Sequence, residues 1–89
     1  MNKKIIQKTA FMNKILKRYA ILVEGDFEYE PGIFKRDIVT VIYPAGTMES
    51  FKNMGKAIEY LERGGLKEVE QQVLPSDVSN TLKNMLDNL

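Results

Sequence analysis

The side chains best suited to chemistry in this 89-residue sequence are carboxylates, because the chain contains neither histidine nor cysteine. The absence of these two residue types excludes disulfides, thiolate metal sites, cysteine nucleophiles and Ser-His-Asp triads. Four acidic residues alternate along one stretch: Glu24, Asp26, Glu28 and Glu30. Same-face residues of a strand lie about 6.5–7 Å apart, so two of these carboxylates could approach one Mg²⁺ but four could not. The alternation is more typical of a solvated strand face that discourages edge-to-edge pairing.

The string Ile21–Asp26, which reads ILVEGD, resembles the glutamate motif of Toprim domains. In that family a glutamate at the end of a strand works with a downstream Asp-x-Asp to hold Mg²⁺. This chain contains no Asp-x-Asp and its Asp37 stands alone, so the second half of the motif is missing. We therefore predict no metal site, no cofactor and no catalytic residues, and we expect the protein not to be an enzyme.

Basic residues are concentrated at the start of the chain. Residues 1–23 contain six basic and no acidic residues, whereas residues 24–89 contain seven basic and twelve acidic ones, so the two parts carry net charges of +6 and −5. Such polarisation favours interaction over catalysis. The basic segment can also rest against the acidic remainder of its own domain. The candidates for neutralising phosphates of DNA or RNA are Lys4, Lys8, Lys14, Lys17 and Arg18.

The elements that position these residues are expected to form a single α+β domain over residues 1–89. The predicted order is an N-terminal helix, a β-hairpin, a helix, a third, edge strand and a C-terminal helix. Residues 3–18 are predicted to be helical because apolar residues recur near helical spacing, at Ile5, Phe11, Met12, Ile15, Leu16 and Tyr19. The stretch from Lys3 to Phe11 is also compatible with an extended strand.

Residues 19–30 and 33–43 are predicted to form the hairpin around Pro31-Gly32. Proline fixes φ at the second turn position, and glycine accepts the positive φ that a type II turn requires at the third. A bulge would shift the register, because type II turns fit hairpin twist less well than the primed types. A two-residue loop pairs Ile21 with Ile42, Leu22 with Val41, Val23 with Thr40, Glu28 with Lys35 and Tyr29 with Phe34.

The rest of the chain is predicted to contain two helices and a short strand. Thr47 is the expected N-cap of a helix over 48–63, which Gly64-Gly65 ends. Residues 66–74 fit either a strand or a helix, and the double glycine before them favours an edge strand. Ser76 is the expected cap of a last helix over 77–88.

One face of the hairpin is apolar and is expected to be buried by another element or by a partner. The second strand is apolar in both phases, as a strand covered on two sides would be. Either a terminal helix covers the second face within the monomer, or a symmetric dimer or a partner protein buries it. The residues of this expected interaction surface are Leu22, Val39, Val41 and Tyr43.

These observations predict a small non-enzymatic protein-interaction or regulatory module, either homodimeric or bound to another protein. Phage and mobile-element accessory proteins that bind or inhibit a host protein are often of this size and composition. A nucleic-acid-binding protein that uses the basic N-terminal helix is the alternative. The absence of cysteine favours a cytoplasmic location, and the longest apolar run, Tyr19–Val23, is far too short to span a membrane.

Overall fold

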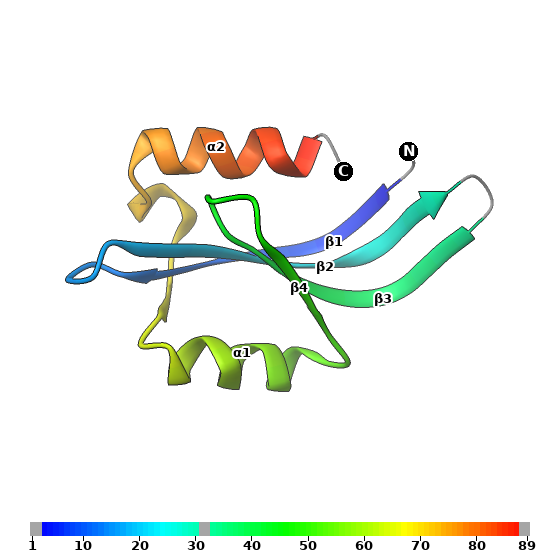
Figure 1. The fold of residues 1–89 in the computed structure, drawn as a ribbon, viewed down its shortest axis with the longest axis horizontal. Helices are drawn as coiled ribbons and strands as arrows, with labels where there is room; N and C mark the ends of the chain where they lie inside the picture. Colours follow the sequence, from blue (N-terminus) through cyan, green and yellow to red (C-terminus); the bar gives the residue numbers. More distant parts are fainter. Residues whose placement is uncertain (1–2, 31–32, 88–89) are drawn as a thin grey trace.

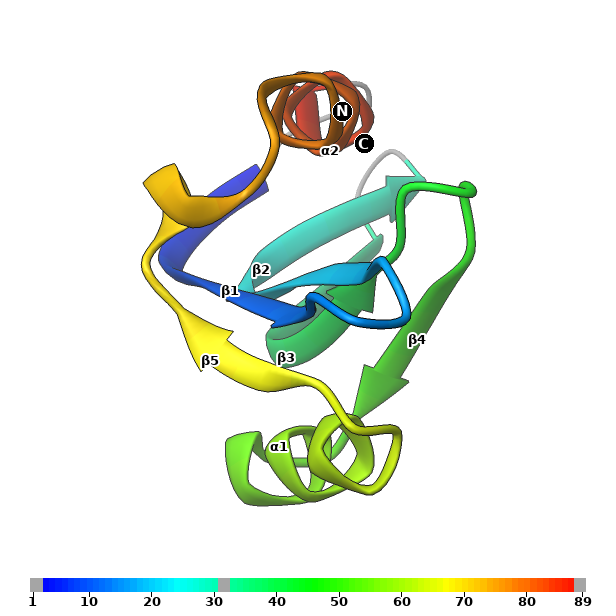
Figure 2. The same ribbon diagram turned by 90° about the vertical axis from the view of Figure 1, so that its left-hand side faces the viewer.

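A computed structural model of the chain describes the backbone of residues 3–30 and 33–87 and the side chains of residues 8–26 and 39–87. The described chain forms a five-stranded antiparallel sheet with one helix on each face (Figure 1, Figure 2). The sheet order is β4-β3-β2-β1-β5, so β2 is its central strand. In chain order the elements are β1 (Lys3–Asn13), β2 (Arg18–Glu30), β3 (Ile33–Ile42), β4 (Met48–Phe51), α1 (Met54–Arg63), β5 (Lys67–Val69), the 3-10 helix η1 (Gln71–Val73) and α2 (Ser76–Asp87).

The sheet has a hydrophobic core on each face, because successive side chains of a strand point to opposite sides. In β2, Ile21 and Val23 face α2, whereas Ala20 and Leu22 face α1. The buried residues of the α2-side core are Ala10, Ile21, Val23, Ile42, Leu74, Leu82 and Leu86. The buried residues of the α1-side core are Phe11, Ala20, Leu22, Val39, Val41, Ala57, Leu61 and Leu66.

The predicted N-terminal helix over residues 3–18 is wrong, and with it the predicted element order. This segment forms β1 and a turn, and β1 pairs with β2, with Ala10 opposite Ile21 and Phe11 opposite Ala20. Ala10 enters the α2-side core and Phe11 the α1-side core, as alternation along a strand requires. A helix would have placed Phe11 and Ile15 on one buried stripe, but Ile15 is 92% exposed.

The predicted hairpin is present, and its register is correct at the open end. Ile21 pairs with Ile42, Leu22 with Val41 and Val23 with Thr40. The expected pairing of Glu28 with Lys35 is wrong, because an irregularity after Gly25 shifts the register by one residue and places Lys35 opposite Phe27. The turn itself, Pro31-Gly32, lies outside the described residues.

The helix predicted over 48–63 begins six residues too early. Met48–Phe51 is strand β4, which pairs with β3 and places Phe51 opposite Val39. Asn53 rather than Thr47 is the N-cap of α1, and its side chain accepts a hydrogen bond from the backbone N–H of Lys56 at 2.9 Å.

The predicted end of this helix is confirmed by a Schellman motif. The N–H of Leu66 donates to the carbonyl of Leu61 at 3.0 Å, and the N–H of Gly65 donates to that of Glu62 at 2.9 Å. Gly65 has a φ of +80°, which a residue with a side chain rarely adopts. Leu61 and Leu66 both lie in the α1-side core, so the motif also directs the chain back to the sheet.

The ambiguous segment 66–74 contains both a strand and a helical turn. β5 adds three residues to the β1 edge, with Val69 opposite Ala10, and η1 follows it. The predicted C-terminal helix is confirmed as α2, with Leu82 and Leu86 buried on its inner face. Among the described residues, no helix is long and apolar enough to cross a membrane.

Phe11→Ala is expected to lower the free energy of unfolding by about 3–5 kcal/mol, because the ring fills the α1-side core at 1% exposure. Ile15→Ala, four residues later, is expected to change it by less than about 0.5 kcal/mol, because this side chain packs against nothing in the sheet. Urea denaturation of both variants checks this contrast. Similar losses of stability in the two variants would instead indicate a helical stripe.

Candidate binding surface at the β1–β2 turn

The acidic residues of β2 lie along the central strand and not at an edge of the sheet. Glu24 and Asp26 are partly exposed on the central strand, and the side chains of Glu28 and Glu30 lie outside the described residues. Among the residues whose placement is described, no group of three or more Asp or Glu side chains could hold a metal ion. The interpretation of this stretch as a face that protects an open edge is wrong, because β2 is paired on both sides.

The expected interaction surface on the hairpin is covered within one chain. Leu22, Val39 and Val41 are buried under α1, at no more than 3% exposure, and Tyr43 is partly buried at the border of the same core. The expectation that this face lies open for a partner is therefore wrong. The cover comes from α1, whereas the sequence pointed to one of the terminal helices.

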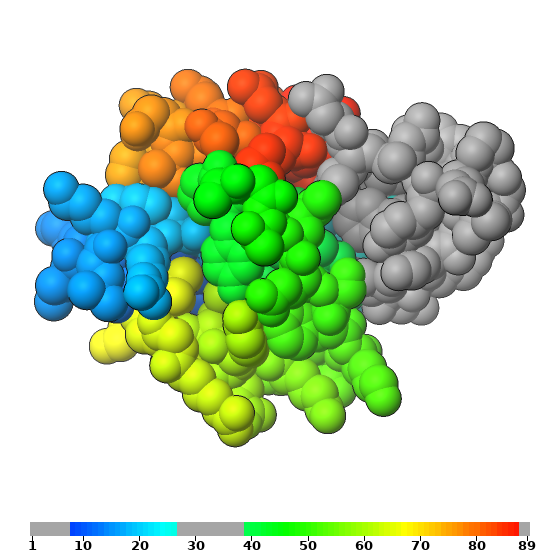
Figure 3. Space-filling view, in the orientation of Figure 1, coloured from blue at the N-terminus to red at the C-terminus, as the bar shows by residue number. Residues whose placement is uncertain are grey.

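The structure brings three of the five candidate basic residues together, on a turn instead of a helix. Lys14, Lys17 and Arg18 lie at the β1–β2 turn and are exposed, whereas Lys8 is further along β1 and the side chain of Lys4 lies outside the described residues. We call residues 14–18 the hairpin tip; it projects at one end of the molecule, between the layers of α1 and α2 (Figure 3).

The hairpin tip presents two large apolar side chains to solvent. Ile15 is 92% exposed and Leu16 is 59% exposed, although the sequence predicted both on a helical stripe. They lie between the positive charges of Lys14, Lys17 and Arg18. An isolated exposed leucine is ordinary, but an adjacent apolar pair at the end of a projecting turn is a candidate contact site. The sequence signal that could have identified this turn is Asn13, a common turn former, placed before Lys14.

Asn13 fixes the conformation of the hairpin tip. Its side-chain oxygen accepts a hydrogen bond from the backbone N–H of Leu16 at 2.9 Å, and its side-chain nitrogen donates to the carbonyl of Gly65 at 3.0 Å. Lys17 closes the turn in the left-handed region, at a φ of 53°, and Asn13 pairs with Arg18 to begin the ladder. The tip is thus attached to the α1–β5 connection.

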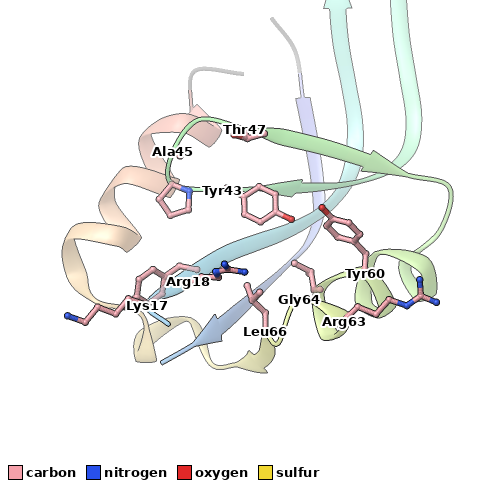
Figure 4. Close-up of a pocket in the computed structure, with 12 residues that line it drawn as sticks. Lys17, Arg18, Tyr43, Ala45, Thr47, Tyr60, Arg63, Gly64 and Leu66 are labelled. Carbon is pink, nitrogen blue, oxygen red and sulfur yellow. The ribbon is translucent and has the colours of Figure 1, made fainter. Parts of the chain in front are cut away.

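A groove of about 820 Å³ runs beside the hairpin tip, and we call it the tyrosine groove. Its walls come from the tip, from the β3–β4 loop and from the C-terminal end of α1 (Figure 4). Apart from Thr47, the described residues that line it are aromatic, apolar or basic, and none is acidic: Lys17, Arg18, Tyr19, Tyr43, Pro44, Ala45, Thr47, Tyr60, Leu61, Arg63, Gly64 and Leu66.

The three basic residues of the groove differ in what they can bind. The guanidinium of Arg18 points into the groove, whereas the side chains of Lys17 and Arg63 extend away from it (Figure 4). Arg63 is already paired with Glu59, one helical turn earlier. Arg18 forms no ion pair with any residue that the structure describes. It is therefore the cation available to a ligand in the groove.

Contacts of Tyr60 hold the far wall of the groove. The hydroxyl of Tyr60 donates to Glu49 Oε1 at 3.1 Å, and the hydroxyls of Tyr43 and Tyr60 face each other (Figure 4). The Tyr60 ring also packs against Phe51, with ring centroids 5.2 Å apart. These contacts join the β3–β4 loop to α1. Burial is the main cause that raises the pKa of Tyr43, and its interaction with the Tyr60 hydroxyl and the nearby charge of Glu49 raise it further.

The raised pKa of Tyr43 predicts a loss of stability in alkali. The folded chain keeps this proton at pH values where the unfolded chain, with a tyrosine pKa of about 10, has released it. The stabilising contribution of the Tyr43 hydroxyl is therefore complete below about pH 10 and declines above it. Urea denaturation between about pH 8 and about pH 11 should show a steeper loss in the wild type than in Tyr43→Phe, with Tyr60→Phe intermediate. Parallel curves for all three proteins would contradict this account of the Tyr43 hydroxyl.

Searches against protein-family models, curated proteins and solved structures found no match to this chain.

Proposed function

We propose that the protein is a small non-enzymatic module that binds a partner protein through its hairpin tip. The observation that carries the proposal is the exposure of Ile15 and Leu16 on a turn that Asn13 holds in place. Protein interfaces combine an apolar, desolvated centre with a polar rim, and tyrosine and arginine are enriched among the residues that dominate binding. The tip, with the tyrosine groove beside it, has this composition.

The chemistry of the tip specifies the partner surface that would complement it. Ile15 and Leu16 require an apolar socket, because their burial on binding supplies the main driving force. Lys14, Lys17 and Arg18 require acidic residues around that socket, which speed association and fix orientation. Since the cations of the tip form no ion pair with any acidic residue whose side chain is described, they do not have to break such a pair to bind.

Two features favour a protein over a nucleic acid as the partner. The most prominent side chains of the tip are aliphatic and offer nothing to phosphates, and the hydroxyl of Tyr60 is already hydrogen-bonded to Glu49. Three cations contact few phosphates, so nucleic-acid binding by this surface would be weak at physiological salt. The proposal places the complex in the cytoplasm, and it includes a role in inhibiting or recruiting a host protein if the chain comes from a phage or mobile element.

A photo-crosslinking amino acid at position 15, introduced in the cells that express the protein, tests this proposal. We expect a discrete protein adduct that resists nuclease and is lost in the Lys17→Glu/Arg18→Glu variant. The matched control carries the crosslinker at Asn84, which is exposed on α2 away from the tip. An adduct of equal yield from position 84, a nuclease-sensitive adduct or no adduct from position 15 would each overturn the proposal.

Once the partner is known, Ile15→Asp is expected to weaken binding at least tenfold, because a charge at the centre of an apolar contact must be desolvated without a partner. Val73→Asp, at a half-exposed position on η1, is the control and should leave affinity unchanged. Isothermal titration calorimetry measures both. An unchanged affinity of Ile15→Asp would exclude the tip as the centre of the interface.

A further inference from the structure

We propose that the tyrosine groove is a binding site for a small carboxylate with an apolar or aromatic body. Arg18 belongs to both the hairpin tip and the groove, but this inference depends on the interior of the groove and not on the contact proposed for Ile15 and Leu16. Its volume, about 820 Å³, lies within the range of small-ligand sites, which are lined mainly by apolar and aromatic groups with a few placed polar ones.

The walls of the groove suit an apolar body. The buried side chains of Leu61 and Leu66 line the groove, as do Pro44 and Ala45 of the β3–β4 loop. The loop is held in position by hydrogen bonds from the N–H of Tyr43 to the carbonyl of Thr47 at 2.9 Å and from that of Gly46 to the carbonyl of Tyr43 at 3.0 Å. A wall fixed in this way loses little conformational entropy when a ligand binds, which favours affinity.

The charge in the groove suits a carboxylate. Arg18 begins β2, where its backbone is held by pairing with Asn13, and its guanidinium points into the groove (Figure 4). A guanidinium offers a planar fork of donors that matches a carboxylate with two parallel hydrogen bonds. Among the described residues, no acidic side chain lines the groove to compete for Arg18.

The tyrosines offer the apolar faces of their rings to the ligand and do not bind its carboxylate. The Tyr60 hydroxyl donates to Glu49, and the hydroxyl of Tyr43 is directed toward that of Tyr60 (Figure 4). Glu49 is not among the lining residues, and its carboxylate accepts the hydrogen bond from the Tyr60 hydroxyl. Recognition of an anion in the groove therefore depends on Arg18, and the proposal can be tested at that residue.

The test is a titration of the ¹⁵N-labelled protein with phenylacetate, followed by NMR, with the neutral isostere phenylacetamide as the paired probe. We expect saturable shifts at Arg18, Tyr43, Tyr60 and Leu66 with phenylacetate, and binding at least tenfold weaker with phenylacetamide. Arg18→Gln should weaken phenylacetate binding at least tenfold. Arg63→Gln removes a cation that lines the same groove but is paired with Glu59, so it should change binding less than twofold.

Equal binding of the two probes, equal effects of Arg18→Gln and Arg63→Gln, or no saturable shift would overturn the proposal. The same spectra show whether each variant remains folded.

The peptide acetyl-Ala-Phe, with a free terminal carboxylate, identifies the source of the ligand. Tighter binding of this peptide than of phenylacetate indicates the chain end of a protein, and equal or weaker binding indicates a free acid. A negative result here leaves the crosslinking test at position 15 unaffected.

Discussion

The three central strands of this protein carry apolar side chains on both faces, and both faces must be removed from water. In β2, four consecutive residues, Ala20 to Val23, are buried alternately in the two cores. One helix cannot cover both sides of a sheet, so two are needed on opposite faces. Burial of each large aliphatic side chain contributes about 1.5–3 kcal/mol, and an uncovered face would forfeit several such contributions.

The connectivity follows from this requirement. The first four strands form a meander that ends at the β4 edge, and α1 then crosses one face of the sheet and carries the chain to the opposite edge (Figure 2). There β5 pairs with β1, and η1 leads into α2, which covers the second face. Gln71 attaches this last connection to β1, since its side chain donates to the carbonyl of Lys8 at 3.2 Å. With both faces covered, the exposed apolar pair of the hairpin tip and the tyrosine groove lie together at one end of the sheet.

The parts of the fold that were predicted correctly are those marked by residues close together in the sequence. The Gly64-Gly65 pair marks the end of α1, and alternating apolar residues fix the register of Ile21 with Ile42. The N-terminal strand was mistaken for a helix because β1 is apolar in both phases near Ala10 and Phe11, and Ile15 and Leu16 in the turn extend this pattern at helical spacing. The spacing of apolar residues cannot distinguish a helix from a strand that is buried on both faces. The tyrosine groove was not predictable, because it is assembled from three segments that only the fold brings together.

Native-state hydrogen exchange, measured residue by residue by NMR, tests the two-sided sheet most directly. The account predicts that the amides of residues 20–23 in β2 exchange most slowly and that those of residues 9–12 in β1 are also protected, because both segments are hydrogen-bonded within the covered sheet. Rapid exchange at residues 9–12, or helical chemical shifts there, would contradict it.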